Sequence, residues 1–257
     1  MTAPVAEIAG LTKAFGGLHA LRDVSFAVAP GEILGIIGPN GAGKTVLINT
    51  ITGFYRADAG SIRFGGRDIT HLSMHGIGRL GIARTFQNIR LFSRMSALEN
   101  VMTASPSYAR TPFRALLSVG RRKADIDRAL GFLDAVELAG KADMPAGALP
   151  YGDARRLEIA RALATEPRLL LLDEPAAGMN ERESACLVED IARLRGRLDA
   201  IILIEHDMGV VRALANRLLA FDAGRLIASG GLDAVLRHPL VVQAYLGEEE
   251  GALAGDP

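Results

Sequence analysis

Residues 38–45 read GPNGAGKT and match the pattern G-x-x-x-x-G-K-S/T. The apolar run ILGII at 33–37 precedes them and predicts a buried strand, whereas the apolar spacing over 44–52 predicts a helix. Glycines let backbone N–H groups converge on a phosphate without obstruction by Cβ atoms, and a helix N-terminus favours an anion. We therefore predict that this loop binds nucleotide phosphates, with Lys44 at the β- and γ-phosphates and the Thr45 hydroxyl on Mg²⁺. The predicted phosphate-contacting residues are Gly38, Pro39, Asn40, Gly41, Ala42, Gly43, Lys44 and Thr45.

A pair of carboxylates follows a second apolar run. Residues 169–174 read LLLLDE, which places Asp173 and Glu174 at the C-terminal end of a predicted buried strand. In an open parallel sheet that end is the edge where ligands bind. Asp173 suits the Mg²⁺ shell, directly or through water, and Glu174 suits a general base that orients an attacking water. Taken alone, the segment could be a solvated acidic turn, and the phosphate loop is what favours the catalytic interpretation.

The composition excludes several classes of protein. A chain of 257 residues with 49% apolar and 23% charged residues is globular and long enough to bury a sizeable core. Lys+Arg and Asp+Glu each total 29, and the net charge of +0 argues against nucleic acid as a partner. A single cysteine, Cys186, excludes an internal disulfide and indicates a reducing compartment. The longest stretches without charged side chains, 33–43 and 45–55, fall short of the roughly 20 apolar residues of a spanning helix, and we find no pattern typical of a secretory leader.

Strand and helix patterns alternate along the chain. Strand patterns fall at 24–28, 33–37, 61–64, 81–86, 168–172, 200–204, 217–221 and 225–228. Helical spacing replaces them between 96 and 164, with apolar faces over 126–136 and 153–164. This order predicts a parallel α/β core with an inserted α-helical subdomain. We place the core at 1–88 and 166–247, the insertion at 89–165 and an acidic tail at 248–257.

Further motifs follow the phosphate loop in a fixed order. Gln87 lies in ARTFQN, and Tyr151 and Gly152 lie in LPYGDARRLEIARAL. The segment EPAAG begins at Glu174, and His206 lies in LIEHD. In order and spacing these motifs resemble the ATP-binding subunits of ABC transporters over nearly the whole chain. The resemblance implies one ATP-binding domain over 1–257 that hydrolyses ATP with Mg²⁺, and an α/β fold: a P-loop NTPase (ABC ATPase) core with an antiparallel β subdomain and an inserted α-helical subdomain.

The resemblance also implies roles for three isolated side chains. Gln87 would touch the shell of the Mg²⁺ or of the attacking water and link it to the helical subdomain. His206 would bond the γ-phosphate and position water. Phe15 would stack on the adenine ring. The alternatives are a surface glutamine at a strand end, a structural histidine and a packed loop phenylalanine.

The signature segment at 149–163 would serve a second subunit, because in the family it completes the ATP site of the opposite chain. The residues expected to reach the partner's ATP are Tyr151, Gly152 and Asp153. Four residues depart from the usual pattern. Pro150 replaces a serine, Asp153 a glutamine, Asn180 an aspartate, and Val46 a second serine or threonine after Lys44 and Thr45. We expect Arg155 and Arg156 to lie on a solvated helix face.

The segments FGGLHAL, ARTFQNIRLF and HPLVVQAYLGEE indicate one subfamily of these ATP-binding subunits. They resemble the corresponding segments of the subunit that powers importers of branched-chain or other hydrophobic amino acids. Implied partners are a second ATP-binding subunit, like or unlike, two membrane permeases and, indirectly, a periplasmic binding protein, at the cytoplasmic face of the inner membrane. Urea or amide import, a soluble non-transport ABC ATPase and a small-molecule kinase are the competing interpretations.

Overall fold

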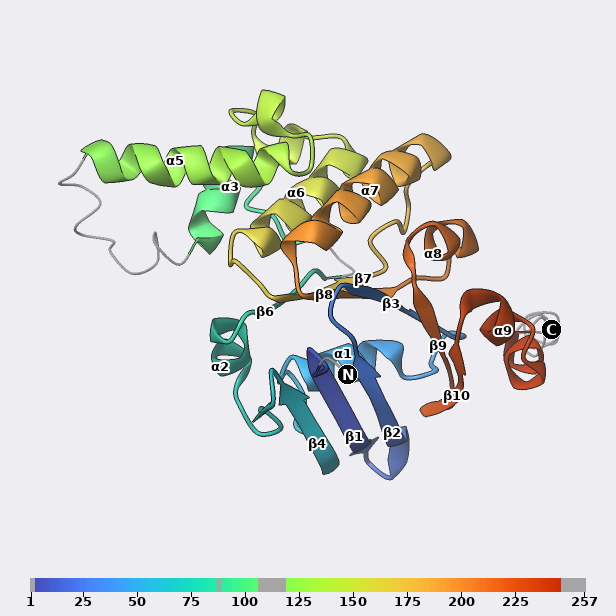
Figure 1. The fold of residues 1–257 in the computed structure, drawn as a ribbon. Coiled ribbons are helices and arrows are strands. Elements are labelled where there is room, and N and C mark those ends of the chain that lie inside the picture. The colour runs from blue at the N-terminus through green and yellow to red at the C-terminus, as the bar shows by residue number, and fades with distance from the viewer. Residues whose placement is uncertain (1–2, 87–88, 106–118, 246–257) are drawn as a thin grey trace.

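Two β-sheets and several helices make up residues 3–86, 89–105 and 119–245, which the computed structural model describes (Figure 1). The smaller sheet is antiparallel. Its strands, in spatial order, are β2 (Leu18–Val28), β1 (Ala6–Phe15), β4 (Ala59–Phe64) and β5 (Arg67–Asp68). This sheet confirms the predicted antiparallel β portion of the fold.

The larger sheet has six strands among the described residues, and its order differs from the order in the chain. In space the strands are β10 (Arg225–Gly230), β9 (Arg217–Asp222), β3 (Glu32–Ile37), β8 (Ala200–Ile204), β7 (Leu169–Asp173) and β6 (Ile82–Arg84). The neighbours from β9 to β6 pair in parallel, and β10 pairs antiparallel with β9. Parallel neighbours require crossover connections, and helices supply them.

Helices cover the six-stranded sheet on both sides. They are α1 (Lys44–Ile51), α2 (Met74–Arg79), α3 (Ala97–Ala104), α5 (Val119–Asp134), α6 (Tyr151–Leu163), α7 (Glu181–Leu194), α8 (Met208–Leu214) and α9 (Leu232–Leu236). Short 3₁₀ turns lie at Ala139–Lys141, Ala146–Ala148 and Arg195–Arg197. In Figure 1, α3, α5, α6 and α7 lie on one side of this sheet, and α1 and the antiparallel sheet lie on the other.

The apolar core is divided by the central strands. Leu170 and Leu172 of β7 join the cluster formed with α3, α5, α6 and α7. Leu169 and Leu171 join the opposite cluster, which α1 and the antiparallel sheet complete. Because successive side chains of a strand point to opposite faces, an all-apolar strand such as β7 fits only between two covered faces. The run LLLLD is therefore buried throughout.

The predicted elements are confirmed, with shifts at their ends that are largest among the strands in β2, which begins at Leu18 rather than at Val24. The helix expected over 44–52 is α1, and the strand expected over 81–86 is the shorter β6. Helices α3, α5 and α6 all lie between β6 and β7 in the chain, as the helical pattern over 96–164 predicted. The acidic tail at 248–257 falls outside the described residues.

Candidate functional site

The phosphate loop lies between β3 and α1, as predicted. Gly43 precedes α1 with φ 100°, and a Cβ atom there would stand 2.5 Å from the Ala20 carbonyl oxygen. Gly38 has φ 151°, and a Cβ atom there would stand 2.3 Å from the Phe221 carbonyl oxygen. Both positions therefore require glycine for conformation and for space. The two glycines bring the loop close against β2 and β9 while α1 begins at Lys44.

Lys44 is the buried cation of this loop. Its side chain is 8% exposed, and its Nζ donates hydrogen bonds to the carbonyl oxygens of Gly38 and Pro39, the latter at 2.8 Å. Thr45 follows it in the first turn of α1 and is exposed. The amine is thus held over the loop, and the hydroxyl is accessible beside it.

The register of the large sheet places the other candidate residues at the same edge. Ile204 of β8 pairs with Ile36 of β3 on one side and with Asp173 of β7 on the other. The three strands therefore end side by side. The phosphate loop follows β3, Glu174 follows β7 and His206 lies two residues beyond β8, so three of the predicted motifs meet at the carboxyl edge where ligands bind in such sheets.

Asp173 is a buried carboxylate at this edge, with only 2% of its surface exposed. Burial raises the pKa of Asp173, and the neighbouring charge of Glu174 raises it further, while Arg84 and Lys44 oppose the shift. A divalent cation would offset this concentration of negative charge. The available donors, a carboxylate and the Thr45 hydroxyl, are oxygen ligands of the kind that Mg²⁺ uses together with substrate phosphates. The residues present therefore fit the predicted magnesium site.

Glu174 is half-buried and has φ 49°, an unusual backbone conformation for a residue with a side chain. Its backbone N–H donates to the Ile204 carbonyl oxygen at 3.0 Å, which fixes the turn after β7 to the end of β8. The loop that continues from it ends at Asn180, whose side chain caps α7 in a reciprocal arrangement with Glu183. Asn180, which departs from the family pattern, therefore has a structural role as a helix cap.

Glu205 is a functional candidate that sequence reasoning missed. It is 1% exposed, and burial raises the pKa of its carboxyl group, although backbone N–H donors including Ala176 partly oppose the rise. Its Oε1 accepts from the Ala176 N–H at 2.8 Å and its Oε2 accepts from the His206 N–H at 3.2 Å. Glu205 thereby connects the loop after Glu174 to the exposed His206. Its position directly after the apolar run AIILI, at the edge used by Asp173, was the available signal.

Phe15 ends β1 and is 42% exposed. Its ring packs edge-on against Tyr55 with centroids 4.9 Å apart, and the Lys13 amine lies 5.2 Å from the ring centre. Phe15 therefore remains partly accessible to solvent, which suits the predicted stacking on adenine. Gln87, predicted to act on the magnesium or water shell, falls outside the described residues.

The signature residues stand at the start of α6. Pro150 precedes the helix and provides no side-chain cap. Tyr151 is 44% exposed, and its hydroxyl donates to the Ala177 carbonyl oxygen at 2.9 Å. Gly152 is buried against the Glu183 side chain. The carboxylate of Asp153 forms ion pairs with Lys141 and Arg156 of the same chain, so its negative charge is compensated locally.

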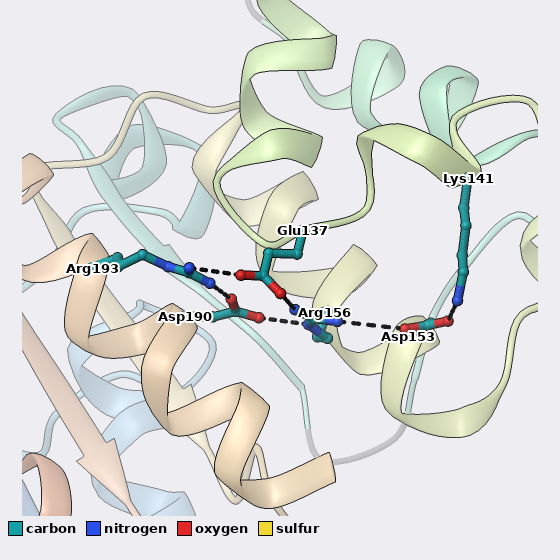
Figure 2. Close-up of polar contacts among 6 residues, drawn as sticks. All are labelled: Glu137, Lys141, Asp153, Arg156, Asp190 and Arg193. Carbon is teal, nitrogen blue, oxygen red and sulfur yellow. Dashed lines mark hydrogen bonds and ion pairs between the residues drawn. The ribbon is translucent and has the colours of Figure 1, made fainter. Parts of the chain in front are cut away.

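The expectation that Arg155 and Arg156 lie on a solvated helix face is wrong. Arg156 is 12% exposed and forms an ion pair of 2.5 Å between its Nε and the fully buried Asp190 (Figure 2). Arg193 contacts the same carboxylate from α7, and Glu137 accepts from both arginines. This Asp190 network joins α6 to α7 and to the end of α5. Arg155 is 4% exposed and points to a different set of partners.

A groove of about 800 Å³ opens beside β6, between α2 and the C-terminal half of α6. The charged side chains along it are Arg79, Arg84, Arg90, Arg161, Arg168, Glu158 and Glu166. Positive charge therefore predominates. Within the described part of the chain, the buried Nε atoms of Arg84 and Arg161 have no hydrogen-bond partner. The groove thus presents mainly positive charge, although these two donors are themselves buried.

Comparison with known proteins decides the family. Residues 21–177 match the family described as ABC transporter. The chain belongs to this ABC transporter family. The match confirms the predicted resemblance to the ATP-binding subunits of ABC transporters, and it confirms the predicted α/β fold of an ABC ATPase. As a family member, this ABC chain binds nucleotide and is an ATP hydrolase.

Relatives of this ABC chain match it along almost its whole length. The high-affinity branched-chain amino acid transport ATP-binding protein BraF of Pseudomonas aeruginosa is 42% identical over 254 residues, which cover 96% of this chain and 100% of BraF. The corresponding protein LivG of Escherichia coli K12 is 41% identical with the same coverage. A solved structure, the ADP conformation of MJ1267, an ATP-binding cassette of an ABC transporter, superposes with a TM-score of 0.84 at 32% identity, covering 96% of this chain and 100% of that one.

Two further observations concern membrane and metal. Within 3–86, 89–105 and 119–245, no helix of this ABC chain has the length and apolar character needed to span a bilayer. In the same residues no cluster of three or more histidine, cysteine, aspartate or glutamate side chains is arranged to hold a metal. A magnesium ion at Asp173 and Thr45 would therefore depend on nucleotide oxygens and water for its remaining ligands.

Proposed function

We propose that this chain is the ATP-hydrolysing subunit of an importer for branched-chain or related hydrophobic amino acids. The observation that carries the proposal is the meeting of the phosphate loop, the Asp173–Glu174 pair and His206 at one sheet edge. The choice of solute rests on BraF and LivG, which align over 96% of the chain. The chain acts as one ATP-binding domain, with a core at 1–88 and 166–247 and a helical signature subdomain at 89–165.

In this proposal each of a few side chains has its own role in ATP binding and hydrolysis. Lys44 exchanges its loop carbonyls for the β- and γ-phosphate oxygens, a stronger charge-assisted contact. Thr45 and Asp173, with Gln87, hold Mg²⁺, which neutralises phosphate charge when bound. Glu174 accepts a proton from the attacking water, and His206 bonds the γ-phosphate. Phe15 stacks on the adenine.

The complete site requires a second ATP-binding subunit. Tyr151, Gly152 and Asp153 stand at the start of α6, where backbone N–H groups favour a phosphate of the partner's ATP. Pro150 supplies no side-chain cap to this 13-residue helix, so the N-cap residue does not compete with phosphate for the first backbone donors. Because Asp153 is neutralised by Lys141 and Arg156, its carboxylate repels that phosphate less than an isolated one would.

The groove beside β6 is the surface we assign to the permeases. Its predominantly basic lining complements a cytoplasmic permease segment that presents carboxylates or carbonyl oxygens. Contact there would hold the chain at the cytoplasmic face of the inner membrane as a peripheral subunit. A periplasmic binding protein would act on it only through the permeases.

The test is reconstitution with the permeases, a second ATP-binding subunit and a binding protein in vesicles. We expect leucine, isoleucine or valine to stimulate ATP hydrolysis, and a Glu174→Gln complex to show no stimulation. Stimulation by urea or amides instead would overturn the solute. A chain that stays off the membrane when its permeases are present would overturn the transport function.

Docking at the groove is tested separately. Arg79→Glu reverses an exposed charge at the groove and should weaken retention by permease-containing membranes. Arg225→Glu reverses an exposed charge on β10, outside the groove, and should leave retention unchanged. Equal retention of the two variants at low salt would contradict this assignment of the groove.

A further inference from the structure

Arg155 lies one turn inside α6 and is almost fully buried, with 4% of its surface exposed. Its Nη1 donates to the Phe86 carbonyl oxygen at 2.9 Å, and its Nε donates to the Tyr151 hydroxyl at 3.3 Å. A guanidinium presents several donors in a fixed planar fork, so one arginine can bond acceptors from separate segments. Here those segments are the end of the β6 region and the start of α6.

Glu158, three residues further along α6, bonds the backbone of the same residue, Phe86. Its Oε1 accepts from the Phe86 N–H at 3.3 Å, and its Oε2 lies 3.4 Å from Nη1 of Arg155. The donor and the acceptor of Phe86 are therefore both bonded by side chains of one helix. Phe86 directly precedes Gln87 in the chain. The backbone that leads to the predicted glutamine is thus fixed to α6.

The Tyr151 hydroxyl extends these contacts to the catalytic loop. It donates to the Ala177 carbonyl oxygen at 2.9 Å, and the tyrosine ring lies against Gly178. Ala177 stands three residues after Glu174, whose carbonyl oxygen accepts the Ala177 N–H at 3.2 Å. A continuous path of hydrogen bonds therefore runs from the Glu174 turn through Tyr151 and Arg155 to Phe86.

We propose that Arg155 is a positioning residue for ATP hydrolysis: through Tyr151 and Glu158 it holds the loop after Glu174 and the backbone before Gln87 in a fixed relation to the signature helix. The inference rests on the proposed hydrolytic site and deepens it. This role does not require Arg155 to touch a reacting atom. Its effect is on the alignment of groups that do, and a small misplacement of such groups lowers turnover strongly.

Arg155 bonds the Tyr151 hydroxyl and the Phe86 carbonyl through two separate nitrogens, Nε and Nη1. A lysine at position 155 retains the charge but has a single nitrogen, so we expect at least one of these two contacts to be lost. We expect Arg155→Lys to lower kcat about 10- to 100-fold, the equivalent of one or two lost charged hydrogen bonds. The affinity for MgATP, measured in the Glu174→Gln background, should stay within about twofold because the phosphate contacts are untouched. Arg193→Lys, in the Asp190 network, is the matched control and should leave kcat unchanged.

The decisive measurement is a double-mutant cycle on kcat with the full chain. Tyr151→Phe keeps the ring and removes the hydroxyl that links Arg155 to Ala177. If the path acts as one unit, Tyr151→Phe should lower kcat in the wild-type background and add little to Arg155→Lys. Additive effects, an Arg155→Lys kcat equal to that of wild type, or a loss of kcat matched by a loss of MgATP affinity would each overturn the proposal.

Two results separate this proposal from the one it rests on. A wild-type chain without ATPase activity, or a Glu174→Gln variant with full activity, would refute the hydrolytic site itself. If Arg155→Lys does not fold, Tyr151→Phe decides alone, since its packing is unchanged: reduced kcat at unchanged MgATP affinity supports the path, and wild-type kcat refutes it.

Discussion

The Glu205 carboxylate accepts a 2.8 Å hydrogen bond from the backbone N–H of Ala176, although 29 positions separate the two residues in the chain. The other oxygen of the same carboxylate accepts the N–H of His206. One buried side chain thus sets the distance between the loop that carries Glu174 and the segment that carries His206. A carboxylate suits this position because it can accept at both oxygens.

Replacement of Glu205 should therefore damage both stability and catalysis. Glu205→Ala leaves the Ala176 N–H buried without an acceptor, which costs about 1–3 kcal/mol of unfolding free energy. Glu205→Gln places an amide NH₂ against one of the two N–H donors and should not restore kcat. Urea unfolding and steady-state hydrolysis measure the two effects. Wild-type kcat in Glu205→Gln would contradict the two-sided contact.

Glu174→Gln should retain MgATP binding while turnover nearly stops. Glutamine keeps the shape of the side chain but lacks the carboxylate that accepts a proton, and a general base typically contributes about 100- to 10,000-fold. Single-turnover hydrolysis gives the rate, and size-exclusion chromatography with ATP should reveal an accumulated dimer. Rapid hydrolysis by this variant would exclude Glu174 as the base.

Lys44→Ala should lose nucleotide affinity. The amine that now contacts Gly38 and Pro39 is the group expected to compensate the β/γ charge, and one charged hydrogen bond is worth about 1.5–3 kcal/mol. A weakening of about 10-fold or more in titrations with a fluorescent ATP analogue is the expected result. Glu174→Gln, measured in parallel, should bind like wild type. Equal affinities for all three proteins would remove Lys44 from the site.

Glu158 makes a pH-dependent contribution to stability. Burial raises the pKa of Glu158 above its ordinary value of 4.5, and the Phe86 N–H and Arg155 only partly oppose this. The folded chain therefore favours the protonated form, and the stability gained from it is full below that ordinary value and lost as pH rises through the raised pKa. The glutamine of Glu158→Gln does not ionise, so this variant does not lose stability in this way as pH rises. The stability of Glu158→Gln relative to wild type should grow from mildly acidic pH to pH 8 in urea titrations, and a constant or shrinking difference would contradict the shift.

The Asp190 network should respond sharply to loss of Arg156. Arg156→Ala leaves the fully buried Asp190 with Arg193 as the one other partner drawn in Figure 2, and the loss of a hydrogen bond to a charged group costs about 1.5–3 kcal/mol. Arg128→Ala removes an exposed pair with Glu166 and should change stability little. Thermal unfolding of both variants tests the contrast. Similar losses in the two variants would show that burial does not set the difference.

Local patterns predicted the phosphate loop and the Asp173–Glu174 edge because both depend on short stretches of chain. Residues 33–45 contain the strand, the glycines and the helix start that shape the loop, and the end of a buried strand identifies the ligand edge. The pairing of β3 with β8 brings His206 close to the phosphate loop. The role of His206 was predicted from the family resemblance and not from its spacing in the sequence.

The contacts of Arg155 and Glu205 could not be predicted from local sequence patterns. Helical spacing shows which positions of α6 are apolar, but the Phe86 carbonyl that bonds Arg155 lies 69 positions away in the chain. An arginine in an amphipathic pattern is ordinarily solvated. Its burial became predictable only once the path of the backbone around α6 was known. The contact of Glu205 was equally unpredictable, since Glu205 follows β8 whereas its partner Ala176 lies in the loop after β7.

The strand order has a consequence for folding during synthesis on the ribosome. The strand β3 and the GPNGAGKT loop are synthesised more than 150 residues before both neighbours of β3, because β8 and β9 lie beyond residue 199. Such long-range pairing is slow to form. The nascent chain therefore carries its phosphate loop on an unpaired strand until residues 200–222 have been synthesised, and nucleotide can help to complete folding only after that point.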